Sequence, residues 1–186
     1  KHGHDHSGKA DPHAWQDVKN VRTYVANIRD GLIAADPAGK ASYEANAASY
    51  IAKLDALDAE IRAEIGKIPA ADRKLITSHD AFSYFAKAYG VTFLAPVGVS
   101  TEAEASAKDV ANLIRQAKAQ KVKAIFLESF SNPKLAEQIS RETGARLGGR
   151  LYSDALTDAS GPAATYIDMM RHNITELSKA LTGGQA

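Results

Sequence analysis

Apolar residues recur at helical spacing over the first part of the chain. After Asp11-Pro12 they are separated by steps of three and four positions, which predicts an amphipathic helix. Proline fits the first helical turn, where no backbone N–H is needed, and Asp36-Pro37 ends the pattern. The apolar positions are Val18, Val21, Val25, Ile28 and Leu32.

A second helical pattern runs from about Ala38 to Ile68. At 1.5 Å per residue this helix is about 45 Å long, and a long helix with one apolar stripe is typical of a rigid connection between two units. A coiled coil would need a partner helix, and the stripe is too short and too rich in alanine and tyrosine to favour one. The stripe consists of Tyr43, Ala47, Tyr50, Leu54, Leu57, Ile61, Ile65 and Ile68.

After Pro69 the spacing changes, and short β-rich runs alternate with helical ones. The runs are 74–79, 91–97, 123–129 and 145–152, and a last helix follows at 162–181. Each gap between runs is long enough for a helical crossover. The pattern predicts an α/β lobe with a mostly parallel four-stranded sheet flanked by helices and preceded by the long interlobe helix.

These patterns divide the chain into four parts. We expect a His-rich flexible loop at 1–10, a helix with a ligand at its start at 11–37, a long linker helix at 38–69 and a C-terminal α/β lobe at 70–186. The first residues, KHGHDHSGKA, contain no initiator methionine and no apolar signal core. We therefore expect a processed or incomplete chain that begins inside a flexible loop, with its signal peptide and any N-terminal partner half outside this sequence.

Composition excludes several classes of protein. The net charge is +1 and no basic run is interleaved with aromatic residues, so we expect no nucleic-acid partner. No apolar stretch approaches the roughly 18 residues of a membrane-spanning helix. The sequence contains no cysteine, which excludes thiolate metal sites and disulfides.

Side chains able to bind a metal follow three of the four predicted strands. His79, Glu128 and Asp154 each stand where a strand ends. Because the carboxyl ends of parallel strands share one edge, we expect these side chains to converge. Imidazole and carboxylate together suit Zn²⁺, or Mn²⁺ if more oxygens contribute. His13, at a helix start, is a further candidate, and the alternative for Asp154 is a helix cap.

The remaining histidines are weaker candidates. His2, His4 and His6 alternate in the N-terminal loop, where flexible imidazoles could bind zinc at low affinity or simply be solvated. His172 lies inside the last helix, and we interpret it as a surface or hydrogen-bonded histidine rather than a ligand.

Three segments resemble one known family. The segments DPHAW at 11–15, SHDAFSYFAKAYG at 78–90 and LYSDAL at 151–156 are similar to those of the cluster A-I metal-binding proteins of ABC importers, the family of ZnuA and TroA. The residues of these segments, their spacing and the His-rich loop before them are most similar to those of the AztC-type zinc-binding proteins. The resemblance extends from the loop to the last helix.

The resemblance implies a function without enzymatic activity. It assigns His13, His79 and Asp154 as metal ligands, with a fourth ligand, a histidine, supplied by the missing N-terminal lobe. It also implies a periplasmic location and delivery of Zn²⁺ to an ABC transporter membrane permease, with a zinc-donor protein as a further candidate partner. Manganese-binding relatives tend to have glutamate where this chain has His79, so the nitrogen ligand favours zinc. Glu128 is expected to orient a ligand imidazole by accepting its other N–H.

Other functions stay open at this point. Three ligands and an open coordination position could also serve a zinc-dependent hydrolase, although no sequence motif places a general base next to the metal. A manganese-binding homologue would use the same scaffold with a different metal. An adhesin is a further alternative, for which the sequence indicates no particular surface.

Overall fold

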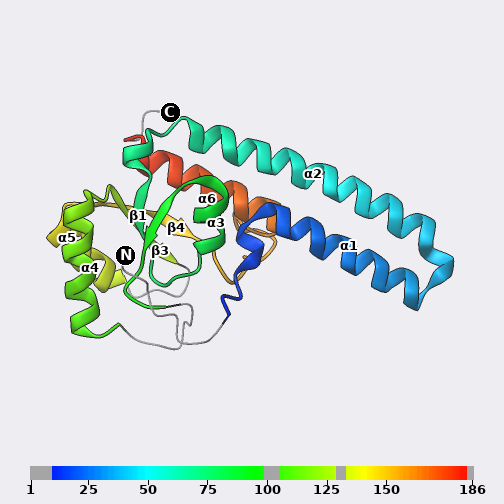
Figure 1. The fold of residues 1–186 in the computed structure, drawn as a ribbon, viewed down its shortest axis with the longest axis horizontal. Helices are drawn as coiled ribbons and strands as arrows, with labels where there is room; N and C mark the ends of the chain where they lie inside the picture. The colour runs from blue at the N-terminus through cyan, green and yellow to red at the C-terminus, as the bar shows by residue number, and fades with distance from the viewer. Residues whose placement is uncertain (1–9, 99–104, 129–132, 184–186) are drawn as a thin grey trace.

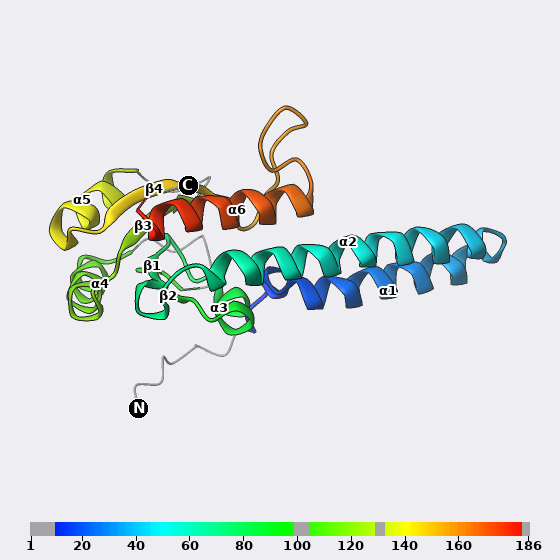
Figure 2. The same ribbon diagram turned by 90° about the horizontal axis from the view of Figure 1, so that it is seen from above.

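The computed structural model describes residues 10–98, 105–128 and 133–183. A helical hairpin, drawn in blue and cyan, projects from one side of an α/β lobe (Figures 1 and 2). The near end of the hairpin is built into the lobe, whereas its far end stands clear of the sheet in both views. The predicted α/β fold is confirmed.

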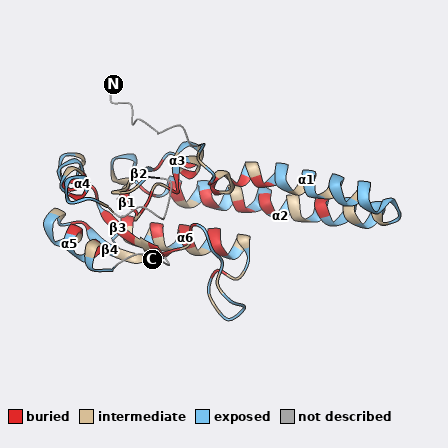
Figure 3. Cartoon of the chain, turned by 90° about the horizontal axis from the view of Figure 1, so that it is seen from below, coloured by how far each residue is buried: buried red, intermediate tan, exposed pale blue. Residues whose placement is uncertain are grey.

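The hairpin consists of α1 (Val18–Ala35) and α2 (Lys40–Gly66), joined by a short 3-10 turn at Pro37–Gly39. The Asp17 side chain caps α1 by accepting from the backbone N–H of Lys19. Only the first part of the predicted α1 stripe is buried, since Val18 and Val21 reach the core while Ile28 remains 62% exposed. The outer half of α1 lies along α2, and Figure 3 shows it largely exposed.

α2 buries its predicted stripe where it enters the lobe. Leu54, Leu57 and Ile61 are fully buried and pack in one cluster with residues of α3 (Ser83–Tyr89) and α6 (Tyr166–Leu181). The second half of α2 therefore anchors the hairpin in the core of the lobe. Within the described ranges, no helix has the length and apolar character needed to cross a membrane.

The lobe is built on a parallel sheet with strand order β2-β1-β3-β4. Its strands are β1 (Lys74–Ile76), β2 (Thr92–Leu94), β3 (Ala124–Glu128) and β4 (Arg146–Leu151). Neighbouring strand residues face opposite ways, as the two-residue period requires. Leu75 packs toward α2, α3 and α6, whereas Ile76 packs toward α4 (Ala107–Gln120) and α5 (Pro133–Thr143).

Gly148 and Gly149 interrupt β4 with an irregularity in strand pairing. Ile125 pairs with Leu147 but Leu127 pairs with Arg150, so β4 carries one extra residue over this step. A Cβ atom on Gly148 would lie 2.4 Å from the ring of Phe126, which is buried in the core. Glycine is therefore required where the aromatic ring lies against the β4 backbone.

We expect Leu54→Ala to destabilise the protein by about 2–5 kcal/mol, because it leaves a cavity where α2 enters the core. Lys53→Ala, at the preceding exposed position of the same helix, should change the free energy of unfolding by no more than about 0.5 kcal/mol. Urea unfolding of both variants measures the difference. Equal effects would contradict the assignment of Leu54 to the core.

Candidate metal centre

The structure brings His13, His79 and Asp154 together at the carboxyl edge of the sheet. His79 follows β1, Asp154 follows β4, and His13 lies just before the 3-10 turn Ala14–Gln16 that leads into α1. Each residue offers one ligand atom, and these atoms all lie within 4.8 Å of one another. Residues from three distant parts of the chain therefore form one cluster that could hold a metal ion.

The carboxylate of Asp154 lies between the two imidazoles. Its Oδ1 is 3.0 Å from Nε2 of His13, and its Oδ2 is 3.2 Å from Nε2 of His79. The two rings meet edge to face with centroids 5.3 Å apart. His13 and His79 are 1% and 2% exposed, whereas the Asp154 side chain is 31% exposed. The Nε2 atoms thus face the same point, and the accessible side of that point lies at Asp154.

A second carboxylate contacts the Nδ1 atom of each imidazole, whose Nε2 atom faces Asp154. Glu128 Oε2 lies 2.7 Å from Nδ1 of His79, and Asp11 Oδ1 lies 2.8 Å from Nδ1 of His13. A carboxylate at Nδ1 sets the ring orientation and directs Nε2 to the centre, the arrangement common around metal-ligating histidines. Glu128 stands where the sequence predicts an orienting carboxylate. Asp11 was missed, although its position two residues before His13 in DPHAW was a usable signal.

Burial and hydrogen bonding act in opposite directions on the pKa values of the cluster. Burial on its own lowers the pKa of His79, but hydrogen bonds to Asp154 and Glu128 outweigh it and raise the pKa to about 9. The pKa of His13 is raised for the same reason, with burial opposed by bonds to Asp154 and Asp11. For Asp154, burial acts to raise the pKa, yet the two imidazoles and Ser153 hold it well below its usual range. The raised pKa values of the two imidazoles and the lowered pKa of the Asp154 carboxyl group thus have one cause, their mutual contacts.

The other predicted candidates lie elsewhere or outside the described residues. His172 is half-buried, and its Nε2 lies 2.8 Å from the backbone oxygen of Arg150, which agrees with the interpretation of a hydrogen-bonded histidine. His2, His4 and His6 fall outside the described residues, so their low-affinity metal binding stays a prediction.

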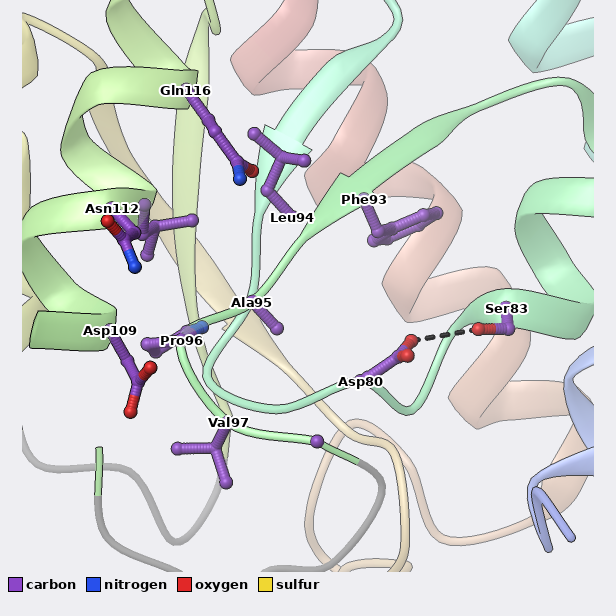
Figure 4. A pocket seen from close by; sticks show the side chains of 12 residues that line it. Asp80, Ser83, Phe93, Leu94, Ala95, Pro96, Val97, Asp109, Asn112 and Gln116 are labelled. Atoms are coloured by element: carbon purple, nitrogen blue, oxygen red, sulfur yellow. Dashed lines mark hydrogen bonds between the residues drawn. The ribbon is translucent and has the colours of Figure 1, made fainter. Parts of the chain in front are cut away.

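A pocket lies between β2 and α4 (Figure 4). Asp80 and Asp109 line it, but both carboxylates are already engaged. Asp80 accepts a hydrogen bond from the Ser83 hydroxyl at 2.8 Å, and Asp109 accepts one from Ser106 at the start of α4. Its lining contains none of the three clustered residues, so it is separate from the candidate metal centre.

Comparison with known proteins identifies relatives over nearly the whole chain. Residues 1–180 match the model of the family described as "ZnuA: Zinc-uptake complex component A periplasmic". The chain is 39% identical to the iron-binding protein YfeA of Yersinia pestis over 174 residues, which are 94% of this chain and 56% of YfeA. It is 32% identical to the manganese ABC transporter substrate-binding lipoprotein PsaA of Streptococcus anginosus, covering 97% of this chain and 58% of PsaA. The chain thus spans a little over half the length of these curated relatives.

Solved structures show the same fold. The periplasmic zinc-binding protein TroA of Treponema pallidum superposes with a TM-score of 0.89 at 36% identity, covering 95% of this chain and 65% of TroA. The Mn-bound periplasmic metal-binding protein of Candidatus Liberibacter asiaticus gives 0.85 at 32% identity, covering 96% and 66%. The metals in these names include zinc, manganese and iron, so the likeness does not by itself select one.

We expect the metal-free protein to lose stability as the pH rises from about 6.5 to about 9. The folded-state pKa of His79 lies above its unfolded value of 6.5, so its stabilising contribution is complete below pH 6.5 and lost as the pH passes 9. Thermal unfolding in the presence of a chelator measures this slope. His79→Ala should flatten it, while His172→Ala serves as the matched histidine control and should keep it. If the dependence of stability on pH is unchanged in His79→Ala, the raised pKa of His79 is not its cause.

Proposed function

The chain belongs to the ZnuA family of periplasmic metal-uptake components, and from this membership we propose that it captures Zn²⁺ and delivers it to the membrane permease of an ABC importer. The observation that carries the proposal is the convergence of two imidazole nitrogens and a carboxylate within 4.8 Å. In this function the metal is cargo. The periplasmic description of the family supports a location outside the cytoplasmic membrane.

Zinc is proposed as the cargo because of the donor atoms. His13 and His79 contribute neutral nitrogen, the ligand type that suits tetrahedral Zn²⁺, whereas Mn²⁺ sites are richer in oxygen. Glu128 and Asp11 lie behind the imidazoles, where they favour nitrogen ligation by His79 and His13. Placement within the AztC-type zinc-binding subgroup is part of this proposal and is supported by DPHAW with a His-rich segment before it.

We place the fourth ligand, a histidine, in a part of the full protein beyond this chain. Asp154 is the accessible member of the cluster, so the open coordination position lies on its side. A contiguous apolar face on the outer side of α1 is also exposed, which suits coverage by further polypeptide. This face comprises Tyr24, Ile28 and Leu32. In this proposal the metal site is formed between two lobes. This chain supplies one side of it, which consists of the helices at 11–37 and 38–69 and the lobe at 70–186.

Family membership also bears on the alternatives. The matched family consists of uptake components rather than enzymes, which removes the support for a zinc-dependent hydrolase. A manganese-binding or iron-binding homologue remains the second candidate, because relatives with those metals in their names share this fold. The ligand at position 79 is the feature that distinguishes the zinc proposal from this candidate.

We expect the full-length protein to bind one Zn²⁺ tightly and His79→Ala to lose that affinity. The loss should exceed the roughly 10–100-fold that removal of an orienting partner causes, because a ligand itself is removed. Calorimetric titration with Zn²⁺ measures the affinity, and His172→Ala should bind as the wild type does. Wild-type affinity in His79→Ala would refute the proposed site.

His79→Glu should shift metal preference toward Mn²⁺. A second carboxylate adds a hard oxygen ligand, so the ratio of Mn²⁺ to Zn²⁺ affinity should rise relative to the wild type. Parallel titrations with each metal give this ratio. If the wild type already binds Mn²⁺ as tightly as Zn²⁺, the manganese alternative replaces the zinc proposal.

A further inference from the structure

Ser153 lies at the junction of hydrogen bonds that reach all three clustered side chains. It is 1% exposed and immediately precedes Asp154. Its Oγ lies 2.7 Å from Oε2 of Glu128 and 2.6 Å from Oδ2 of Asp154. Its backbone oxygen accepts a hydrogen bond from Trp15 Nε1 at 2.9 Å. Hydroxyl and carbonyl of one residue thus face different ligand-bearing segments.

Through Glu128, Ser153 is connected to His79. Glu128 Oε1 accepts from the backbone N–H groups of Ser78 and His79, at 2.8 and 3.1 Å. Its Oε2, which faces the Ser153 hydroxyl, also lies 2.7 Å from Nδ1 of His79. The carboxylate therefore holds both the backbone and the ring of His79, while Ser153 helps to hold the carboxylate.

Through Trp15, Ser153 is connected to His13. Trp15 follows His13 by two residues, and their rings meet edge to face with centroids 5.4 Å apart. The Trp15 backbone oxygen accepts from the Tyr166 hydroxyl at 2.7 Å, which ties the same turn to α6. Gln16 Nε2 lies 3.4 Å from the Ser153 oxygen and adds a weaker contact. The segment that carries His13 is thereby attached to the end of β4.

A simpler explanation is that a buried serine only needs partners for its polar atoms. A backbone carbonyl on either side could satisfy that need. The Ser153 hydroxyl has one proton, and both oxygens within its reach belong to carboxylates, those of the proposed ligand Asp154 and of Glu128, which contacts the His79 ring. Ligands that are ordered before binding avoid the entropic cost of ordering them during binding. An arrangement that orders the ligands beforehand would therefore act on metal affinity as well as on folding.

We propose that Ser153 is a positioning residue that, together with Trp15 and Glu128, holds His13, His79 and Asp154 in the metal-binding arrangement before the metal arrives. This inference rests on the proposed function, because it concerns the same metal centre. Its consequence is that residues which do not touch the metal determine both the affinity and the coordination geometry.

The first experiment compares Ser153→Ala with Ser160→Ala in the full-length protein. Ser160 is an exposed serine of the same segment whose hydroxyl bonds to Asp158, so it is a matched control. We expect Ser153→Ala to weaken Zn²⁺ binding by about 10–100-fold and Ser160→Ala to leave it unchanged. Saturation with Co²⁺ then reports geometry, and its visible absorption spectrum should change in Ser153→Ala alone. A lower affinity with an unchanged Co²⁺ spectrum overturns the positioning role.

A double-mutant cycle with Trp15→Phe and Glu128→Gln tests the connection itself and serves if Ser153→Ala does not fold. Trp15 and Glu128 bond to different atoms of Ser153. If they act through it, the combined loss of Zn²⁺ affinity is smaller than the product of the two single losses. Losses that multiply show independent effects and overturn the proposal.

The two proposals fail in different ways. If wild-type protein does not bind Zn²⁺ tightly, or if His79→Ala binds as the wild type does, the proposed function fails. If the wild type binds tightly and His79→Ala loses binding, but Ser153→Ala matches Ser160→Ala, the positioning role alone fails.

Discussion

One carboxylate between two buried imidazoles is the interaction on which the rest of the centre depends. Asp154 reaches Nε2 of both His13 and His79, and the low pKa of its carboxyl group reflects those contacts. Charged groups are costly to bury unless they are paired and hydrogen-bonded. The surrounding structure meets that requirement with Glu128 and Asp11 behind the rings. A divalent cation at the same point would pair with the Asp154 carboxylate.

The clustered side chains converge because the start of the hairpin crosses the carboxyl edge of the sheet. A parallel sheet places the ends of β1 and β4 at one edge, and β3, which ends in Glu128, lies between them. The start of the hairpin crosses the same edge and adds His13. α2 then runs from the hairpin into the core, so the segment with His13 is anchored to the lobe. The centre is thus assembled where two structural units meet.

The exposed outer half of the hairpin and the accessible side of Asp154 have a common explanation in the proposed function. The chain spans 56–58% of the curated relatives' length. A metal site formed between two lobes needs a second surface that faces the first. The apolar face of α1 and the open position at Asp154 are the features that such a surface would cover. In that proposal the lobe would contribute His79 and Asp154 to the site, and the segment before the hairpin would contribute His13.

The sequence by itself determined the features that depend on local spacing. Strand and helix patterns predicted the parallel sheet and the long helix, and strand ends placed His79, Glu128 and Asp154 at one edge. The alternation of Leu75 and Ile76 between two cores follows from the same two-residue period. Local patterns suffice here because the direction of a side chain is set by its own element.

Only the tertiary structure decided how these groups are connected. The exposure of Ile28 could not be read from a helical stripe, because burial depends on which neighbour is present. The bond from Trp15 to Ser153 joins residues 138 positions apart, and no spacing rule relates them. Such contacts arise where the hairpin crosses the end of β4. The sequence could therefore indicate which side chains converge at the sheet edge, while the chain crossing decided what holds them in place.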